Sequence, residues 1–211
     1  MAKHPENVRA RTAWLARLAI LLAVVIVMTA LNIGNIPIGP IVATVYQVPV
    51  VIGAALLGVG AGCILGGAWG VFCFWLALSG QTTDIVALAT VQQSPLLYFC
   101  IAFFPRLLCG LLSGLVCRGM KRICRGKGTL AYAVTGAVGS LCNTVLYLGA
   151  LYLLIRDLLA SLYHIDVGAV GAMVLSVATT NGLLEAVLSC VLTAAICRAL
   201  GALGSKKGEA S

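Results

Sequence analysis

Long apolar stretches, separated by short segments with polar residues, glycine and proline, make up most of this 211-residue chain. A helix needs about 20 predominantly apolar residues to cross a membrane. The stretch 45–80 is too long for one span, and the glycine-rich segment 58–62 suits a tight turn between two. The pattern predicts an all-α membrane protein, a six-transmembrane-helix bundle that forms a single integral membrane domain over residues 1–211. The predicted spans are 12–34, 45–58, 61–80, 95–117, 129–155 and 167–200.

The composition agrees with this interpretation. Hydrophobic residues make up 61% of the chain and charged residues 9%, whereas soluble domains average about 45–50% and about 25%. Such a composition excludes a disordered chain and an ordinary soluble enzyme. A formal net charge of +8 would suggest nucleic acid as a partner if a soluble face carried it, but in an apolar chain it is first a sign of membrane topology. The expected partner is the lipid bilayer, and no nucleic acid is expected.

Lysine and arginine fall almost entirely on one predicted side of the membrane. Of the 14 basic residues, only Arg156 falls on the other side, and Arg106 lies inside a span. The remaining basic residues are Lys3, Arg9, Arg11, Arg17, Arg118, Lys121, Arg122, Arg125, Lys127, Arg198, Lys206 and Lys207. Because loops rich in lysine and arginine stay in the cytoplasm, both termini are predicted to be cytoplasmic. The expected location is the plasma membrane of a prokaryotic cell, crossed several times.

Small residues recur at four-residue spacing, which places them on one helix face and lets another backbone approach closely. The glycines of this kind are Gly58, Gly62, Gly66 and Gly70, followed later by Gly110 and Gly114. Packing within the chain is the first explanation for them, and contact with a partner protein is the alternative. Ala16, Ala19 and Ala23 form a narrower stripe on the first helix. A helix at the edge of a bundle can offer such a stripe to another protein.

Motifs for enzymatic chemistry are absent from the sequence. There is no Gly-x-x-x-x-Gly-Lys-[Ser/Thr] phosphate loop, no His-x-x-x-His pair for a metal and no Gly-x-Ser-x-Gly nucleophile elbow. The nine cysteines include no Cys-x-x-Cys pair, and we interpret them as small buried hydrophobic residues. We therefore expect no catalytic residue, no metal, no cofactor and no ATPase activity.

Charges inside a membrane span are costly and usually functional, and two charged residues deep within predicted spans stand out. Arg106 follows Pro105 in the fourth span, and Glu185 lies one turn after Asn181 in the sixth. One interpretation is a structural ion pair between Arg106 and Glu185 that locks two helices together. The alternative is that one or both line a pocket for a polar ligand.

Further polar and aromatic side chains occur at outer-to-middle depth on the last three predicted helices. Asn143 and Tyr147 are four residues apart and share a helix face, and Tyr98 lies two turns outward from Arg106. The first three helices carry fewer such groups, which favours a site in the C-terminal half of the chain. The candidate substrate-binding residues are Tyr46, Tyr98, Arg106, Asn143, Tyr147, Asn181 and Glu185.

Two predicted outer loops are candidates for covering this pocket. The first, 32–46, combines turn-forming asparagine, proline and glycine with apolar side chains and ends at Tyr46. This composition favours an ordered lid over a floppy linker. The second, 80–93, holds Asp84 together with glutamine and threonine side chains that can add hydrogen bonds.

Four runs of sequence resemble the substrate-binding S components of energy-coupling factor (ECF) vitamin transporters. They are 36–58, which begins Ile-Pro-Ile-Gly-Pro, 104–115, which begins Phe-Pro-Arg, 139–149, which begins Gly-Ser-Leu-Cys-Asn, and Asn-Gly-Leu-Leu-Glu at 181–185. The order and spacing of these runs, together with the six predicted spans, carry the resemblance. It covers about residues 12–200.

The resemblance implies properties that composition and spacing do not show. S components are six-helix bundles that bind a water-soluble vitamin near the outer face, at a site built from the first outer loop and the last three helices. They work with a transmembrane T component and two cytoplasmic ATPases, which makes an S component a transport subunit and not an enzyme. Ala19 and Ala23 match the family's Ala-x-x-x-Ala motif, which contacts the T component.

The runs around Pro37 and Pro105 are most similar to S components assigned to pantothenate. The guanidinium of Arg106 would match the carboxylate of that vitamin bidentately. Riboflavin, folate and pyrimidine-precursor S components share the general pattern, and a neutral ligand would leave Arg106 to Glu185. A self-sufficient secondary carrier is a further alternative, although the inverted repeats of many carriers are not visible. A membrane enzyme or scaffold has no motif in its favour.

Overall fold

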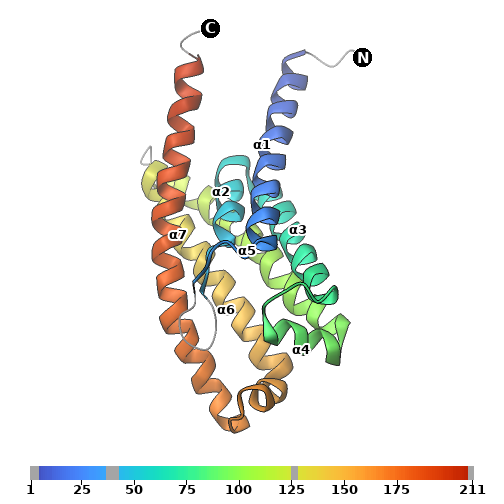
Figure 1. The fold of residues 1–211 in the computed structure, drawn as a ribbon. Helices are drawn as coiled ribbons and strands as arrows, with labels where there is room; N and C mark the ends of the chain where they lie inside the picture. Colours follow the sequence, from blue (N-terminus) through green and yellow to red (C-terminus); the bar gives the residue numbers. More distant parts are fainter. Residues whose placement is uncertain (1–4, 37–42, 125–127, 209–211) are drawn as a thin grey trace.

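The protein is a bundle of long helices in the computed structural model, which describes residues 5–36, 43–124 and 128–208. The first turn of α1 and the last turn of α7 lie at the same end of the molecule (Figure 1). The helices are α1 (Pro5–Ala30), α2 (Gln47–Leu57), α3 (Val59–Leu78), α4 (Ile85–Gln93), α5 (Pro95–Ile123), α6 (Gly128–Tyr163) and α7 (Val170–Gly208). A 3-10 turn, Val167–Ala169, precedes α7.

Five of these helices, α1, α3, α5, α6 and α7, are long and apolar enough to cross a membrane. The prediction of a helical membrane protein is therefore confirmed. The predicted span 45–58 differs, because its helix, α2, has 11 residues, about half of what a crossing requires. The predicted loop 80–93 also differs, because residues 85–93 form α4. The side chain of Asp84 caps this helix by accepting hydrogen bonds from two backbone N–H groups of its first turn.

α2 is short because it is a core helix whose two ends are both fixed inside the bundle. Every residue from Gln47 to Ala55 is buried, and the chain leaves the helix at Gly58, where φ is 98°. The last carbonyl groups of a helix need donors from elsewhere. Lys121 Nζ donates to the carbonyl oxygen of Ala55 at 2.8 Å, and the indole of Trp14 donates to the carbonyl oxygen of Leu57 at 3.1 Å.

Glycine allows α3 and α5 to touch backbone to backbone. A Cβ atom added at Gly62 would collide with the carbonyl oxygen of Gly110, and one added at Gly110 would collide with the carbonyl oxygen of Gly62. Gly66 lies in the same way against the carbonyl oxygen of Arg106. From Gly62 onward, the predicted glycine face is therefore packing within the chain, and it fixes the position of the α5 backbone at Arg106; Gly58 is exposed.

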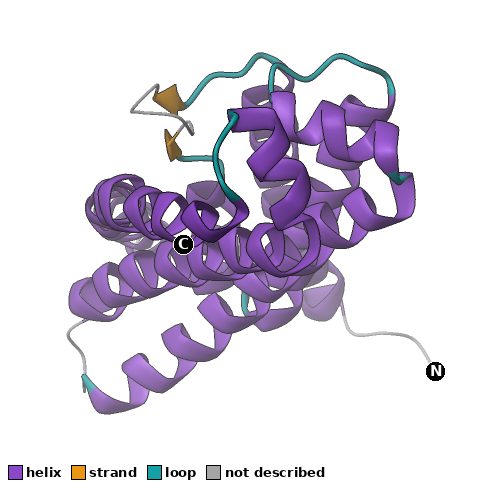
Figure 2. Ribbon diagram, turned by 90° about the horizontal axis from the view of Figure 1, so that it is seen from below, coloured by secondary structure: helices purple, strands orange, loops and turns teal. Residues whose placement is uncertain are grey.

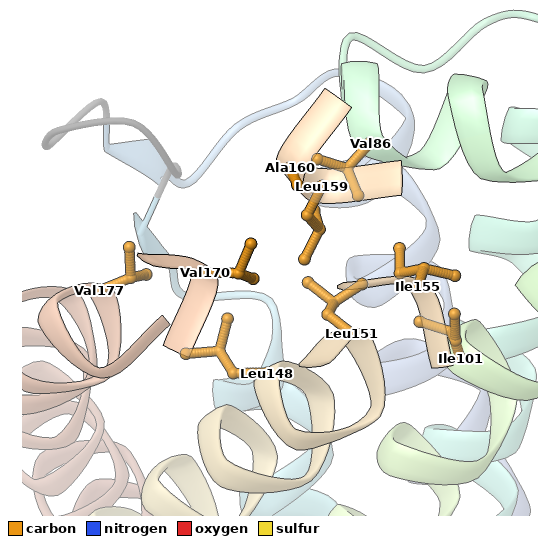
Figure 3. Packing of buried hydrophobic residues seen from close by; sticks show 9 residues of the cluster. All are labelled: Val86, Ile101, Leu148, Leu151, Ile155, Leu159, Ala160, Val170 and Val177. Atoms are coloured by element: carbon orange, nitrogen blue, oxygen red, sulfur yellow. The ribbon is translucent and has the colours of Figure 1, made fainter. Parts of the chain in front are cut away.

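α6 bends sharply at Ile155, where φ is −137° and ψ is 24°. The predicted fifth span ends at this residue, but the helix continues to Tyr163. Figure 3 shows Leu159 and Ala160, beyond the bend, beside Val86 of α4. The bend thus brings the end of α6 into an apolar cluster at the end of the bundle opposite the termini. The cluster consists of Val86, Ile101, Leu148, Leu151, Ile155, Leu159, Ala160, Val170 and Val177.

A short antiparallel ladder joins the two described ends of the first predicted outer loop. β1 (Asn35–Ile36) pairs with β2 (Ala43–Thr44), with Asn35 opposite Thr44. Figure 2, viewed from the end opposite the termini, shows these strands beside the helices. Residues 37–42 of the predicted lid lie outside the described residues, so the structure places the lid only through its two ends.

Candidate ligand-binding site

A cavity of about 370 Å³ lies between the helices, within the range of about 300–1,000 Å³ typical of small-molecule sites. Its lining comes from the last turn of α1, the first turn of α4, the part of α6 from Asn143 onward and the first half of α7, together with residues of β2, α3 and α5. Because these parts lie away from the chain ends in Figure 1, the cavity is in the half of the bundle opposite the termini.

Arg106 provides the positive charge of the cavity. Pro105 lacks the N–H that would bond one turn back in α5, and the Arg106 side chain turns to the same region, where Nη1 donates to the carbonyl oxygen of Ala102 at 2.8 Å. The guanidinium carbon lies 4.8 Å from the ring centroid of Trp69 and 5.2 Å from that of Tyr147. Two aromatic faces therefore stabilise this cation and hold it at the cavity wall.

Glu185 provides a negative charge on another wall, and its exposed fraction is 7%. Its Oε1 accepts a hydrogen bond from the backbone N–H of Thr44 at 2.6 Å. Its Oε2 accepts from the hydroxyl of Thr144 at 3.1 Å and from the amide of Gln47 at 3.4 Å. Neither Glu185 nor Arg106 forms an ion pair within the described ranges, so the interpretation of a structural Arg106–Glu185 pair is wrong.

Aromatic rings and buried amides complete the polar part of the lining. Tyr46 packs edge-on against Trp69, with ring centroids 6.4 Å apart. Tyr98 lines the cavity and is stacked on Phe74, which does not line it, at 6.4 Å between ring centroids. Asn143 of α6 and Asn181 of α7 are buried and line the same cavity. The apolar part of the lining includes Leu148, Leu151 and Val177.

All seven residues that the sequence singled out as candidates for substrate binding line this one cavity. They come from three helices, α5, α6 and α7, and from the segment between β2 and α2. The structure thus brings the candidates together, and it leaves their roles toward a ligand as a prediction.

Comparison with known proteins gives this arrangement a context. A family model for the substrate-specific component of ECF transporters matches residues 14–197. The chain belongs to this family. The pantothenic acid transporter PanT of Lactococcus lactis subsp. cremoris (strain MG1363) is 31% identical over 205 residues, covering 91% of this chain and 95% of that protein. The pantothenate transporter PanT of Leuconostoc mesenteroides subsp. mesenteroides is 30% identical over 141 residues, covering 64% of this chain and 66% of that protein.

Membership confirms the resemblance found in the sequence and the general function that it implies. The ECF substrate-specific component is the subunit that binds the substrate for uptake, here a vitamin, and it is not a catalytic subunit. The chain is a multi-pass protein of the plasma membrane, in agreement with its five long apolar helices.

Sequence reasoning missed several residues in and around the cavity described above. Trp69 and Cys73 of α3 and Thr29 of α1 line it, so the lining extends beyond the last three helices and the first predicted outer loop. Trp69 was missed because an aromatic residue in an apolar span carries no charge signal. Gln47 does not line the cavity but bonds Glu185, and it was missed because the polar start of a core helix resembles an ordinary loop residue.

The second predicted outer loop contributes to the cavity only at its first half. Thr82, Thr83 and Asp84 line the cavity, whereas Gln92 and Gln93, near the end of α4, are exposed. Within the described ranges, no three histidine, cysteine or carboxylate side chains come together as metal ligands would.

Proposed function

We propose that this protein binds pantothenate in the described cavity, from the outer face of the membrane, and delivers it together with a T component and two cytoplasmic ATPases. The observation that carries the proposal is Arg106, a cation at the cavity wall that pairs with no carboxylate in the described part of the chain. A bound carboxylate would complete it, because guanidinium and carboxylate match in charge and in planar geometry. The names of the two relatives support the same ligand.

The remainder of the lining suits the remainder of the vitamin. Pantothenate carries hydroxyl and amide groups, which the buried amides of Asn143 and Asn181 can bond. Its two methyl groups suit an apolar wall such as that formed by Leu148 and Leu151. Tyr46, Tyr98 and Tyr147 combine an apolar ring with a hydroxyl. Together with Glu185, which also lines the cavity, they complete our set of proposed binding residues.

The proposed topology has six crossings with both termini in the cytoplasm. The first turn of α1 and the last turn of α7 lie at the same end of the bundle (Figure 1), which supports an even number of crossings. In this arrangement α2 and the chain that leads into it from β2 together make the second crossing, because α2 is shielded from lipid by its neighbours. The clustering of lysine and arginine near the chain ends and after α5 supports the cytoplasmic assignment.

The proposed contact with the T component is the alanine stripe of α1. Ala16, Ala19 and Ala23 are all exposed. At about 100° per residue, they lie on the side of α1 opposite Leu18 and Val25, which are buried in the bundle. Small side chains there leave a smooth face that another helix can approach closely. The ATPases of the complex would supply the energy, since the chain has no phosphate-binding loop.

Calorimetry on the purified protein tests the ligand. Pantothenate should bind, and Arg106→Ala should weaken its binding by about 2 kcal/mol or more, because the charge-assisted hydrogen bonds are lost. Pantothenol, in which an alcohol replaces the carboxylate, is the matched neutral ligand, and its affinity should change little in the same variant.

Three outcomes would contradict parts of the proposal. Equal losses for pantothenate and pantothenol would show that Arg106 does not face the carboxylate. Binding of riboflavin, folate or a pyrimidine precursor in place of pantothenate would replace the ligand. Uptake by the reconstituted protein alone would show a self-sufficient carrier, not a subunit.

A further inference from the structure

The carboxylate of Glu185 connects three other parts of the chain. It lies on α7 and accepts hydrogen bonds from the backbone of Thr44 in β2, from Gln47 at the start of α2 and from Thr144 in α6. Gln47 also donates to the hydroxyl of Ser140 at 3.1 Å, which bonds the start of α2 directly to α6.

Groups of the protein itself, and not a ligand, donate the hydrogen bonds that the Glu185 carboxylate accepts. Each of its oxygens accepts at least one hydrogen bond from the chain, and the shortest, at 2.6 Å, comes from a backbone donor. Hydrogen bonds to an ionised group are roughly twice as strong as neutral ones. A buried carboxylate without such donors would be strongly unfavourable. The donors therefore stabilise Glu185, and Glu185 in turn fixes the segment that provides them.

The segment so fixed forms part of the cavity wall. Thr44 and Tyr46 line the cavity from the side of β2, and Asn32 lines it from the chain that enters β1. The tie to Glu185 uses the N–H of Thr44, so it is independent of the side chain at that position. Freeing this N–H would let the wall between β2 and α2 move away from α7.

We propose that Glu185 is a positioning residue, which tethers β2 and the start of α2 to α7 and thereby sets how fast a bound ligand can leave the cavity. The tether itself stands on the hydrogen bonds of the ligand-free protein. Only its effect on release of pantothenate rests on the proposed function.

Hydrogen–deuterium exchange on the ligand-free protein in detergent tests the tether. In Glu185→Ala, the amides of residues 43–47 should exchange at least about tenfold faster, as expected for loss of a hydrogen bond to a charged acceptor. Ser189→Ala is the matched control, because Ser189 is a fully buried residue one turn further along α7 and has no hydrogen-bond partner on the ladder. It should leave that exchange unchanged.

Glu185→Gln keeps an oxygen for Thr44 but loses the charge, so it should give a smaller acceleration, and it carries the test if Glu185→Ala does not fold. Unchanged exchange at residues 43–47 in the Glu185 variants would overturn the proposal. An equal acceleration in Ser189→Ala would also overturn it, because the effect would then be a general loosening of α7.

The dissociation rate of pantothenate tests the consequence for the ligand. Glu185→Gln and Thr44→Pro, which removes the donor N–H, should each speed release, and the double variant should be no faster than the faster single variant, because both break one interaction. Additive effects would overturn the link between tether and release. If exchange responds but pantothenate does not bind, the tether stands and the proposed function fails.

Discussion

Two stripes of small residues, with the same spacing in the sequence, have opposite surroundings in the folded protein. Gly62, Gly66 and Gly70 of α3 are buried, and Gly62 touches the backbone of α5 at Gly110. The alanines of α1, among them Ala19 and Ala23, are exposed. One stripe has its partner within the chain, and the other faces outward from a helix at the edge of the bundle.

The difference shows what four-residue spacing of small side chains can establish. It creates a smooth helix face that permits close approach, but it does not say which helix approaches. Neighbouring side chains settle the question for α1, because Leu18 and Val25 on its other side are the ones buried against the bundle. The exposed side also carries Ile20 and Val24, which suits lipid when no protein covers it.

The largest effect should come from adding volume to the buried stripe. Gly62→Leu should lower the free energy of unfolding by about 3 kcal/mol or more, because its Cβ meets the backbone of Gly110, which cannot turn aside. Thermal unfolding in detergent measures the change. Gly60→Leu, in the same helix, is the matched control, because nothing lies within 4 Å of a Cβ at Gly60. Similar losses in both variants would mean that the α3–α5 contact does not depend on glycine.

The long helices could be predicted from the sequence because length and hydrophobicity decide them. Four of the predicted spans correspond to α1, α3, α5 and α7 within several residues at each end. The length of α2 was not predicted correctly, since the hydrophobic pattern of an apolar run is the same whether lipid or protein surrounds it. α4 was missed because its nine residues follow turn-like polar residues and depend on the cap from Asp84.

The candidate site could be predicted where a charge stands in an apolar segment. Arg106 and Glu185 were found for that reason, and the residues near them on the same helix faces followed. The contacts of Arg106 with Trp69 could not be found, because they depend on how α3 lies against α5. The N–H of Thr44 could not be found either, since a backbone donor has no signature in the sequence.

A functional effect should follow from adding volume to the exposed stripe. Ala19→Trp and Ala23→Trp should each abolish pantothenate uptake by the assembled transporter and leave vitamin binding by the purified protein intact, because the face is outside the cavity and exposed. Uptake of labelled vitamin by cells and calorimetry measure the two properties. Ala195→Trp, at an exposed position of α7, is the control and should transport normally. Normal uptake by both α1 variants would remove this face as the contact with the T component.

The smallest effect distinguishes glycines that pack from glycines that do not. Gly119→Ala should raise the free energy of unfolding by about 0.5–1 kcal/mol, because alanine favours the helix and nothing lies within 4 Å of a Cβ at this position in α5. Gly110→Ala, the same change in the same helix, should lower it, since the added carbon collides with Gly62. Thermal unfolding of the two variants side by side gives the sign of each change. Two changes of the same sign would show that helix propensity, and not contact with α3, governs both positions.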